Sequence, residues 1–273
     1  MKKLLIILSL QIGSLLSDSL IVKTLSYLEL NSASDVWVKD TFAYAVGDSG
    51  LFVINVSDPT NPYIITCYDQ GKGKGIFIRD TLAYIAQREG YLVIHNIKNP
   101  ANPFEVGRCS TGTRNWAVVV HGNFAYIGAG KDGLRIIDIS DVTNPYEVGF
   151  NDTFRIDDLC VLGNYVYAAN DDTFSIYEVT DPSNPVLIYA EYIFGGDPWV
   201  GITGWSNYVA ISLPGLEYLT GGCLYIYDVS NPYNPQRIYE LSGDTLVPWF
   251  TDIAILEEES LLVTNCDYPS GWT

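Results

Sequence analysis

GLRIIDISDVTNP, residues 133–145, is the stretch that decides the fold, because similar stretches recur along the chain. Each ends in an Asn-Pro pair, and the other pairs are Asn61-Pro62, Asn102-Pro103, Asn184-Pro185 and Asn234-Pro235. Successive pairs are 41, 42, 40 and 50 residues apart. Self-similarity at a period in this range is the signature of a repeat architecture.

Each repeat contains four short strand-like segments. One precedes the Asn-Pro pair, as at residues 51–55 and 134–138, two more lie upstream, and a fourth follows the pair. They are rich in Val, Ile, Tyr and Phe and are bounded by Gly, Asp, Asn and Pro. Their near-continuous apolar runs indicate sheets covered on both faces.

This arrangement predicts an all-β protein, a β-propeller of four-stranded blades with a repeat of about 41 residues. About six blades are recognisable, and the last is incomplete. A solenoid is the rival architecture, but four strands per repeat are more than a solenoid coil normally uses.

The residue pattern of the repeat also resembles that of a known family. GNFAYIGAG (residues 122–130) followed by GLRIIDISDVTNP is similar to LVIVD-repeat proteins, and the likeness spans nearly all of residues 20–266. The resemblance implies a β-propeller on a secreted or surface protein. It implies no catalytic motif, because the family shares none that could be carried over.

Residues 1–19 are expected to be a signal peptide. Lys2 and Lys3 precede an apolar run over residues 4–16, and small polar residues follow it. The run is short for a membrane span, and cleavage is expected after Ser14 or Ser17. A membrane anchor or a buried first strand is the alternative. Residues 20–273 then form one propeller domain, extracytoplasmic and without a membrane span after cleavage.

The two ends of this domain are expected to meet. Residues 20–30 resemble the strand that follows each Asn-Pro pair, which predicts that they pair as an outer strand with the last blade and remove an exposed edge. Residues 252–256 and 260–264 look like the first two strands of a sixth blade. Either the ring closes with this blade incomplete, or the sequence is a fragment of a longer one, and we expect the fragment.

Composition limits the partners. A net charge of −17 with a pI near 4.2 argues against nucleic acid, since phosphate affinity rests on Lys and Arg clusters, and it disfavours anionic membranes. We expect a soluble monomer. The five cysteines have no CxxC spacing and fall in different repeats, which predicts few or no disulfides and mostly buried thiols.

Little in the chain points to catalysis or to a cofactor. There are only two histidines: His95 falls in a packing column, and His121 follows an inner strand. A His-based triad or a zinc site is therefore not expected. The column of Asn55, Asn96, Asp138, Glu178 and Asp228, like the Asn-Pro turns, is interpreted as structural. No cofactor is expected. Calcium held by Asp157, Asp158, Asp171 or Asp172 is the alternative.

Function is therefore sought where the repeats differ. The loop before the innermost strand of each blade, here called the lead-in loop, lies on the same face as the loop between strands two and three. Unusual side chains in the lead-in loops give the candidate ligand-binding set Arg114, Trp116, Asp157, Asp158, Trp199 and Trp249. An apolar insertion at residues 213–220 is expected at its rim.

Four interpretations of this face remain open. The tryptophans could plug the channel as core. The face could bind a protein, peptide or glycan, hold calcium, or support hydrolysis by paired carboxylates. We predict a secreted or cell-surface, non-catalytic binding module. The alternative is an extracytoplasmic hydrolase or lyase that uses carboxylates at the mouth of the channel, such as Asp158 and Asp252.

Overall fold

The computed structural model describes residues 2–6, 26–69, 71–193, 200–213, 223–242, 250–256 and 261–266. Within these ranges every regular element is a β-strand, and five antiparallel sheets have four strands each. Blade one contains β3 (Asp35–Lys39), β4 (Phe42–Gly47), β5 (Gly50–Asn55) and β6 (Tyr63–Tyr68). Blade two contains β7 (Gly73–Arg79), β8 (Leu82–Gln87), β9 (Tyr91–Asn96) and β10 (Phe104–Ser110).

The next three blades follow the same plan. Blade three contains β11 (Ala117–His121), β12 (Phe124–Gly128), β13 (Leu134–Asp138) and β14 (Tyr146–Asn151). Blade four contains β15 (Asp158–Leu162), β16 (Tyr165–Ala169), β17 (Thr173–Glu178) and β18 (Val186–Tyr192). Blade five contains β19 (Gly201–Trp205), β20 (Tyr208–Leu213), β21 (Cys223–Asp228) and β22 (Gln236–Ser242).

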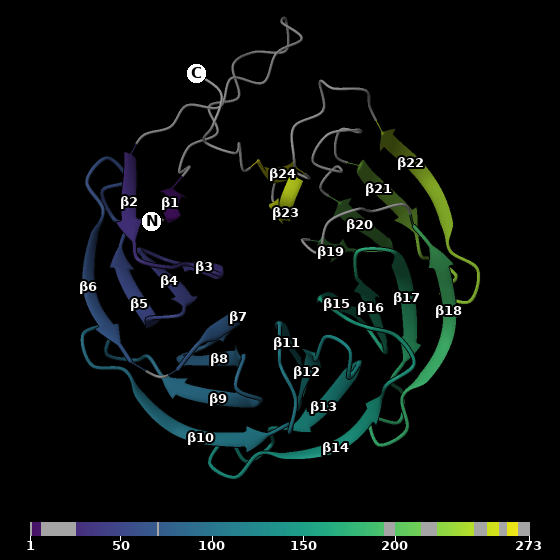
Figure 1. Ribbon diagram of the computed structural model, residues 1–273, viewed down its shortest axis with the longest axis horizontal. Coiled ribbons are helices and arrows are strands. Elements are labelled where there is room, and N and C mark those ends of the chain that lie inside the picture. The colour runs from purple at the N-terminus through teal and green to yellow at the C-terminus, as the bar shows by residue number, and fades with distance from the viewer. Residues whose placement is uncertain are drawn as a thin grey trace, which may run out of the picture.

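The blades stand around a common centre, with the first strand of each innermost (Figure 1). β23 (Phe250–Leu256) pairs with β24 (Leu261–Cys266) and packs against β19 and β20, where a sixth blade belongs. The predicted β-propeller of four-stranded blades is therefore confirmed, and β23 and β24 are the described strands of a sixth blade.

The hydrophobic core lies between blades. One cluster joins Tyr84 and Ile94 of blade two to Val118 and Ile127 of blade three, and similar clusters join blades one and two, three and four, and four and five. Because both faces of a blade are covered in this way, the middle strands read as continuous apolar runs.

The same turn and the same irregularity recur in every complete blade. The residue after each inner strand has a φ of 50–60°, the left-handed region that suits Gly, Asp and Asn. These residues are Asp40, Asp80, Gly122, Gly163 and Ser206. Each outer strand also carries a register shift opposite its third strand, typical of a β-bulge, which bends it around the rim.

The Asn-Pro turns have the structural role that the sequence predicts. In blade three the Asp138 carboxylate accepts the backbone N–H of Ser140 at 2.8 Å, and the Asp141 carboxylate accepts that of Thr143 at 3.0 Å. Equivalent side-chain contacts fix the turn in each of the other four complete blades. The face that carries these turns is called the turn face below.

The expected pairing of residues 20–30 with the last blade is wrong for the strand that forms there. β2 (Ser26–Leu30) pairs instead with β1 (Lys2–Ile6), in a sheet separate from β23 and β24. β2 nevertheless takes the place of an outer strand. Leu30 packs on the free face of blade one, and the Ser26 hydroxyl donates to the carbonyl of Pro59 in that blade's turn. The likeness of residues 20–30 to outer strands thus predicted the location of β2 and not its partner.

The described residues contain no helix long and apolar enough to cross a membrane. Cys67, Cys109, Cys160 and Cys223 are free thiols, as expected. Cys109 and Cys223 are buried and Cys160 is half-buried, in line with the expectation of mostly buried thiols, whereas Cys67 is exposed. Cys266 is outside the residues whose side chains are described.

Candidate functional site

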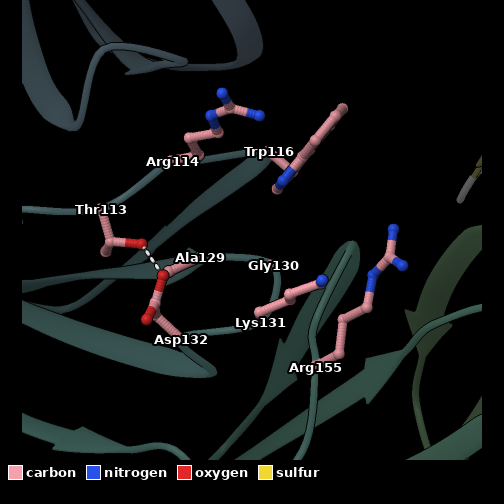
Figure 2. Close-up of a pocket in the computed structure, with 8 residues that line it drawn as sticks. All are labelled: Thr113, Arg114, Trp116, Ala129, Gly130, Lys131, Asp132 and Arg155. Carbon is pink, nitrogen blue, oxygen red and sulfur yellow. Dashed lines mark hydrogen bonds between the residues drawn. The ribbon is translucent and has the colours of Figure 1, made fainter.

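A pocket of about 370 Å³ opens where the lead-in loops of blades three and four meet the loop between β12 and β13. These loops lie on the face opposite the turn face, here called the mouth face. The pocket is lined by Thr113, Arg114, Trp116, Ala129, Gly130, Lys131, Asp132 and Arg155. Figure 2 shows the Lys131 ammonium, the Arg155 guanidinium and the indole nitrogen of Trp116 facing one open space.

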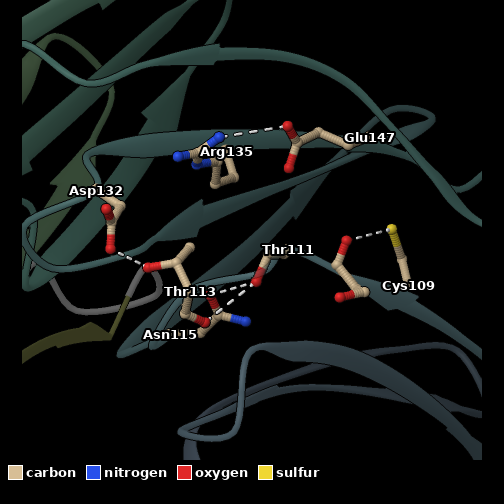
Figure 3. A network of polar contacts seen from close by, with 8 residues as sticks. Cys109, Thr111, Thr113, Asn115, Asp132, Arg135 and Glu147 are labelled. Carbon is tan, nitrogen blue, oxygen red and sulfur yellow. Dashed lines mark hydrogen bonds and ion pairs between the residues drawn. The ribbon is translucent and has the colours of Figure 1, made fainter.

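The lead-in loop of blade three is held from inside. Buried Thr111 donates its hydroxyl to the side-chain oxygen of buried Asn115 at 2.9 Å (Figure 3). The backbone N–H of Thr111 donates to the carbonyl of Gly90 at 2.9 Å. Trp116 then donates its N–H to the carbonyl of Gly128 at 2.8 Å. The exposed Arg114 therefore projects from a loop that is anchored on both sides.

Gly130 joins the two blades at the floor of the pocket. It exchanges two backbone hydrogen bonds with Ile156, at 2.8 and 2.9 Å, which ties the β12–β13 loop to the lead-in loop of blade four. A Cβ at this position would lie 2.7 Å from the indole nitrogen of Trp116, and its φ is +55°. Glycine is thus required here by the backbone and by the indole that rests on it.

Arg155 is positioned by its neighbour Asp157. The Arg155 Nε donates to one carboxylate oxygen of Asp157 at 2.9 Å and lies equally far from the other. The Asp157 side chain is 7% exposed, and burial raises the pKa of its carboxyl, partly opposed by Arg155. The backbone carbonyl of Arg155 accepts the side-chain amide of Asn170 at 3.0 Å. The guanidinium is therefore fixed at its base and 32% exposed toward the pocket.

Among the described residues, one carboxylate lines the pocket, and it is already engaged. Asp132 accepts a hydrogen bond from the hydroxyl of Thr113, the contact drawn in Figure 3. The described residues give no hydrogen bond or ion pair to the side chains of Arg114 and Lys131. The pocket therefore offers hydrogen-bond donors in excess of acceptors.

Asp158 does not line the pocket and instead binds backbone N–H groups. Its carboxylate accepts the N–H of Leu159 at 2.9 Å and the N–H of Ile202, on the next inner strand, at 2.9 Å. Asp35 makes the same tie between blades one and two, with the N–H of Ile76 at 2.7 Å. A contact that recurs between other blades identifies the Asp158 carboxylate as part of the scaffold.

Two of the six sequence candidates, Arg114 and Trp116, thus line the pocket, and Asp157 acts on it through Arg155. Trp199, Trp249 and residues 214–220 of the insertion lie outside the described residues. Sequence reasoning missed Lys131 and Arg155 as members. Both stand in loops that differ between repeats, so loop variation was the available signal.

Metal and histidine chemistry find no support among the described side chains. No group of three or more His, Cys, Asp or Glu in that part of the chain could hold a metal ion, and the calcium alternative stays a prediction. His95 is fully buried in the core, 5.2 Å from the ring of Tyr68, as its packing column predicts.

Comparison with known proteins bears on the fold. A family model described as LVIVD repeat matches four times, at residues 31–70, 70–111, 114–153 and 156–190. Comparison with curated protein sequences gave no match.

Two solved structures are similar in fold. A computationally designed protein, Ika8, has a TM-score of 0.61 and 13% identity, covering 86% of this chain and 68% of its own. BamB from Moraxella catarrhalis has a TM-score of 0.58 and 12% identity, covering 88% and 69%. At such low identity these two structures show the fold alone.

Proposed function

Because this chain belongs to the LVIVD-repeat family, whose repeat builds the blades described above, we propose that it is a non-catalytic binding module. In this proposal it is secreted or displayed on the cell surface. It holds a protein, peptide or glycan partner against the mouth face. The observation that carries the proposal is the pocket, in which an aromatic side chain and several donors converge on a rigid scaffold.

The rival proposal of carboxylate catalysis is weaker for a physical reason. General acid–base hydrolysis needs two carboxyl groups that converge on one open space. Asp158 is bound to backbone N–H groups, and Asp157 is paired with Arg155. The side chain of Asp252 is outside the described set.

Site-specific photocrosslinking would test the binding function. A benzophenone amino acid at exposed Thr153, in the lead-in loop of blade four, should crosslink to a partner from the native surroundings of the protein. The same group at exposed Lys98, on the turn face of blade two, is the matched control. Crosslinks from Lys98 alone, or none from Thr153, would contradict the proposal.

The proposed location has its own test. Residues 1–19 have a basic start and an apolar run, so a tagged chain should appear outside the cytoplasm, shortened at its N-terminus. Replacing Lys2 and Lys3 by Glu should reduce export. Full-length chain retained in the cytoplasm would contradict this part of the proposal. Cleavage after Ser14 or Ser17 would also remove β1 and leave β2 in place.

A further inference from the structure

Four of the eight described residues that line the pocket have side chains that donate hydrogen bonds and do not accept them. Arg114, Lys131 and Arg155 carry N–H groups and have no acceptor, and the indole of Trp116 donates only. Within the described lining, Asp132 is the single charged acceptor, and Thr113 already donates to it. A ligand that suits such a pocket must bring acceptors and few donors.

The pocket gathers positive charge within an acidic chain. Arg114, Lys131 and Arg155 line it together with the carboxylate of Asp132, whereas the whole chain has 15 basic and 32 acidic residues. Asp157, Asp171 and Asp172 lie close enough to Arg155 for their negative charges to act on its guanidinium. Because these acidic neighbours repel anions, a carboxylate with one negative charge suits the pocket better than a phosphate with a charge of about −2.

Two of the donors, Arg155 and Trp116, are held before any ligand arrives. Arg155 is braced by Asp157 and Asn170, and Trp116 lies directly against Gly130. Groups that are already ordered lose less conformational entropy on binding, so their hydrogen bonds contribute more to affinity. The volume of about 370 Å³ admits a side chain or a short chain end rather than a folded surface.

We propose that this pocket binds the carboxylate of an acidic residue in a peptide segment. The inference rests on the proposed binding function and specifies the partner at its mouth face. The carboxylate accepts from Lys131 and Arg155, with the indole N–H of Trp116 and the Arg114 guanidinium beside it. A uronic acid fits less well, because its hydroxyls donate as well as accept and the pocket has no free carboxylate to receive them.

The test uses a minimal probe, the peptide acetyl-Gly-Gly-Glu-Gly-Gly-amide, added to the full chain at about 0.15 M salt. That salt limits repulsion from the distant acidic groups. Binding is followed through the indole N–H resonance of Trp116, assigned with Trp116→Phe. We expect saturable shifts with the Glu peptide and at least tenfold weaker binding of the matched Gln peptide.

Variants of the lining residues test whether the Glu peptide binds in this pocket. Arg114→Gln combined with Lys131→Gln should weaken the Glu peptide at least fivefold, since charge-assisted hydrogen bonds are lost. Lys98→Gln, the same change on the turn face, should leave it unchanged. Both variants should keep the melting temperature of the parent, because these side chains are exposed.

Three results would overturn the inference: equal binding of the Gln peptide, binding unaffected by the double variant, or tighter binding of glucuronate or inorganic phosphate than of the Glu peptide. The proposed function is judged separately. If Thr153 still crosslinks to a partner while the Glu peptide fails, the acidic ligand is wrong and the binding module stands.

Discussion

The turn face repeats one set of contacts in all five complete blades, whereas the mouth face differs from blade to blade. On the turn face, side-chain oxygens such as those of Asp141 cap each Asn-Pro turn, and a backbone hydrogen bond closes it at 3.0 Å. On the mouth face, blade three has Arg114 and Trp116, and blade one has Ser and Ala in the same loop. The recurring residues are those that the blade needs in order to fold. The folding of a blade does not explain the residues that vary between blades on the mouth face, so they are the candidates for function.

The largest expected effect on stability comes from adding a side chain where the turn face has no room for one. Gly149, on the outer strand of blade three, has no room for a side chain: a Cβ would lie 2.2 Å from the carbonyl of Pro182 in the next blade. Because that obstacle is backbone, Gly149→Ala should cost about 3 kcal/mol in the free energy of unfolding. Urea denaturation measures it. Thr66→Ala, in the same column of blade one, is the control and should cost less than about 1 kcal/mol.

A smaller loss is expected where a mouth-face carboxylate belongs to the scaffold. Asp158→Ala removes the tie to the Ile202 N–H and should cost about 2 kcal/mol, as for hydrogen bonds to charged groups. Exposed Asp152→Ala should change stability by less than about 0.5 kcal/mol. If Asp158→Ala were neutral in urea denaturation and impaired ligand binding instead, Asp158 would return to the candidate site.

His95 shows that a departure from the repeat inside the core is not a functional signal. Burial lowers its pKa to about 4, with Glu105 opposing and Arg108 adding to the shift, and neither ring nitrogen has a hydrogen-bond partner in the described part. In the unfolded chain the imidazole of His95 takes up a proton as the pH falls through about 6.5, whereas in the folded chain it stays neutral until about pH 4. Stability is lost as pH falls from about 6.5 toward 4.

At pH 5.5 this loss should be about 1 kcal/mol relative to pH 7.5. The measurement compares the parent with His95→Ile, since Ile54 and Ile137 occupy the same column. The difference between the two proteins removes the contribution of the many carboxylates. A difference that does not change with pH would show that His95 is charged or exposed in solution.

The smallest stability effect is expected in the pocket itself. Arg114→Gln and Lys131→Gln should each change the free energy of unfolding by less than about 0.5 kcal/mol, because both side chains are exposed. Thermal melts at pH 7.5 measure this. Destabilisation above about 1 kcal/mol would mean that the pocket is part of the scaffold, and the contrast between the faces would weaken.

The sequence alone determined the architecture of the blades. Strand positions, turns and blade order follow from short apolar runs and Asn-Pro turns, and the contacts that fix them, such as Asp138 with Ser140, join residues two apart. Local contacts of this kind can be read directly from a repeating pattern. The candidates Arg114 and Trp116 were found in the same way, as deviations from the repeat.

Only the tertiary structure decided which of the residues that deviate from the repeat lie close together in space. Lys131 and Arg155 join Trp116 because Gly130 pairs with Ile156 across two blades, and Asp158 is occupied by an N–H 44 residues away. The repeat pattern likewise did not predict the pairing of β2 with β1. Such contacts depend on how neighbouring blades approach one another, and a pattern that repeats within each blade does not encode that approach.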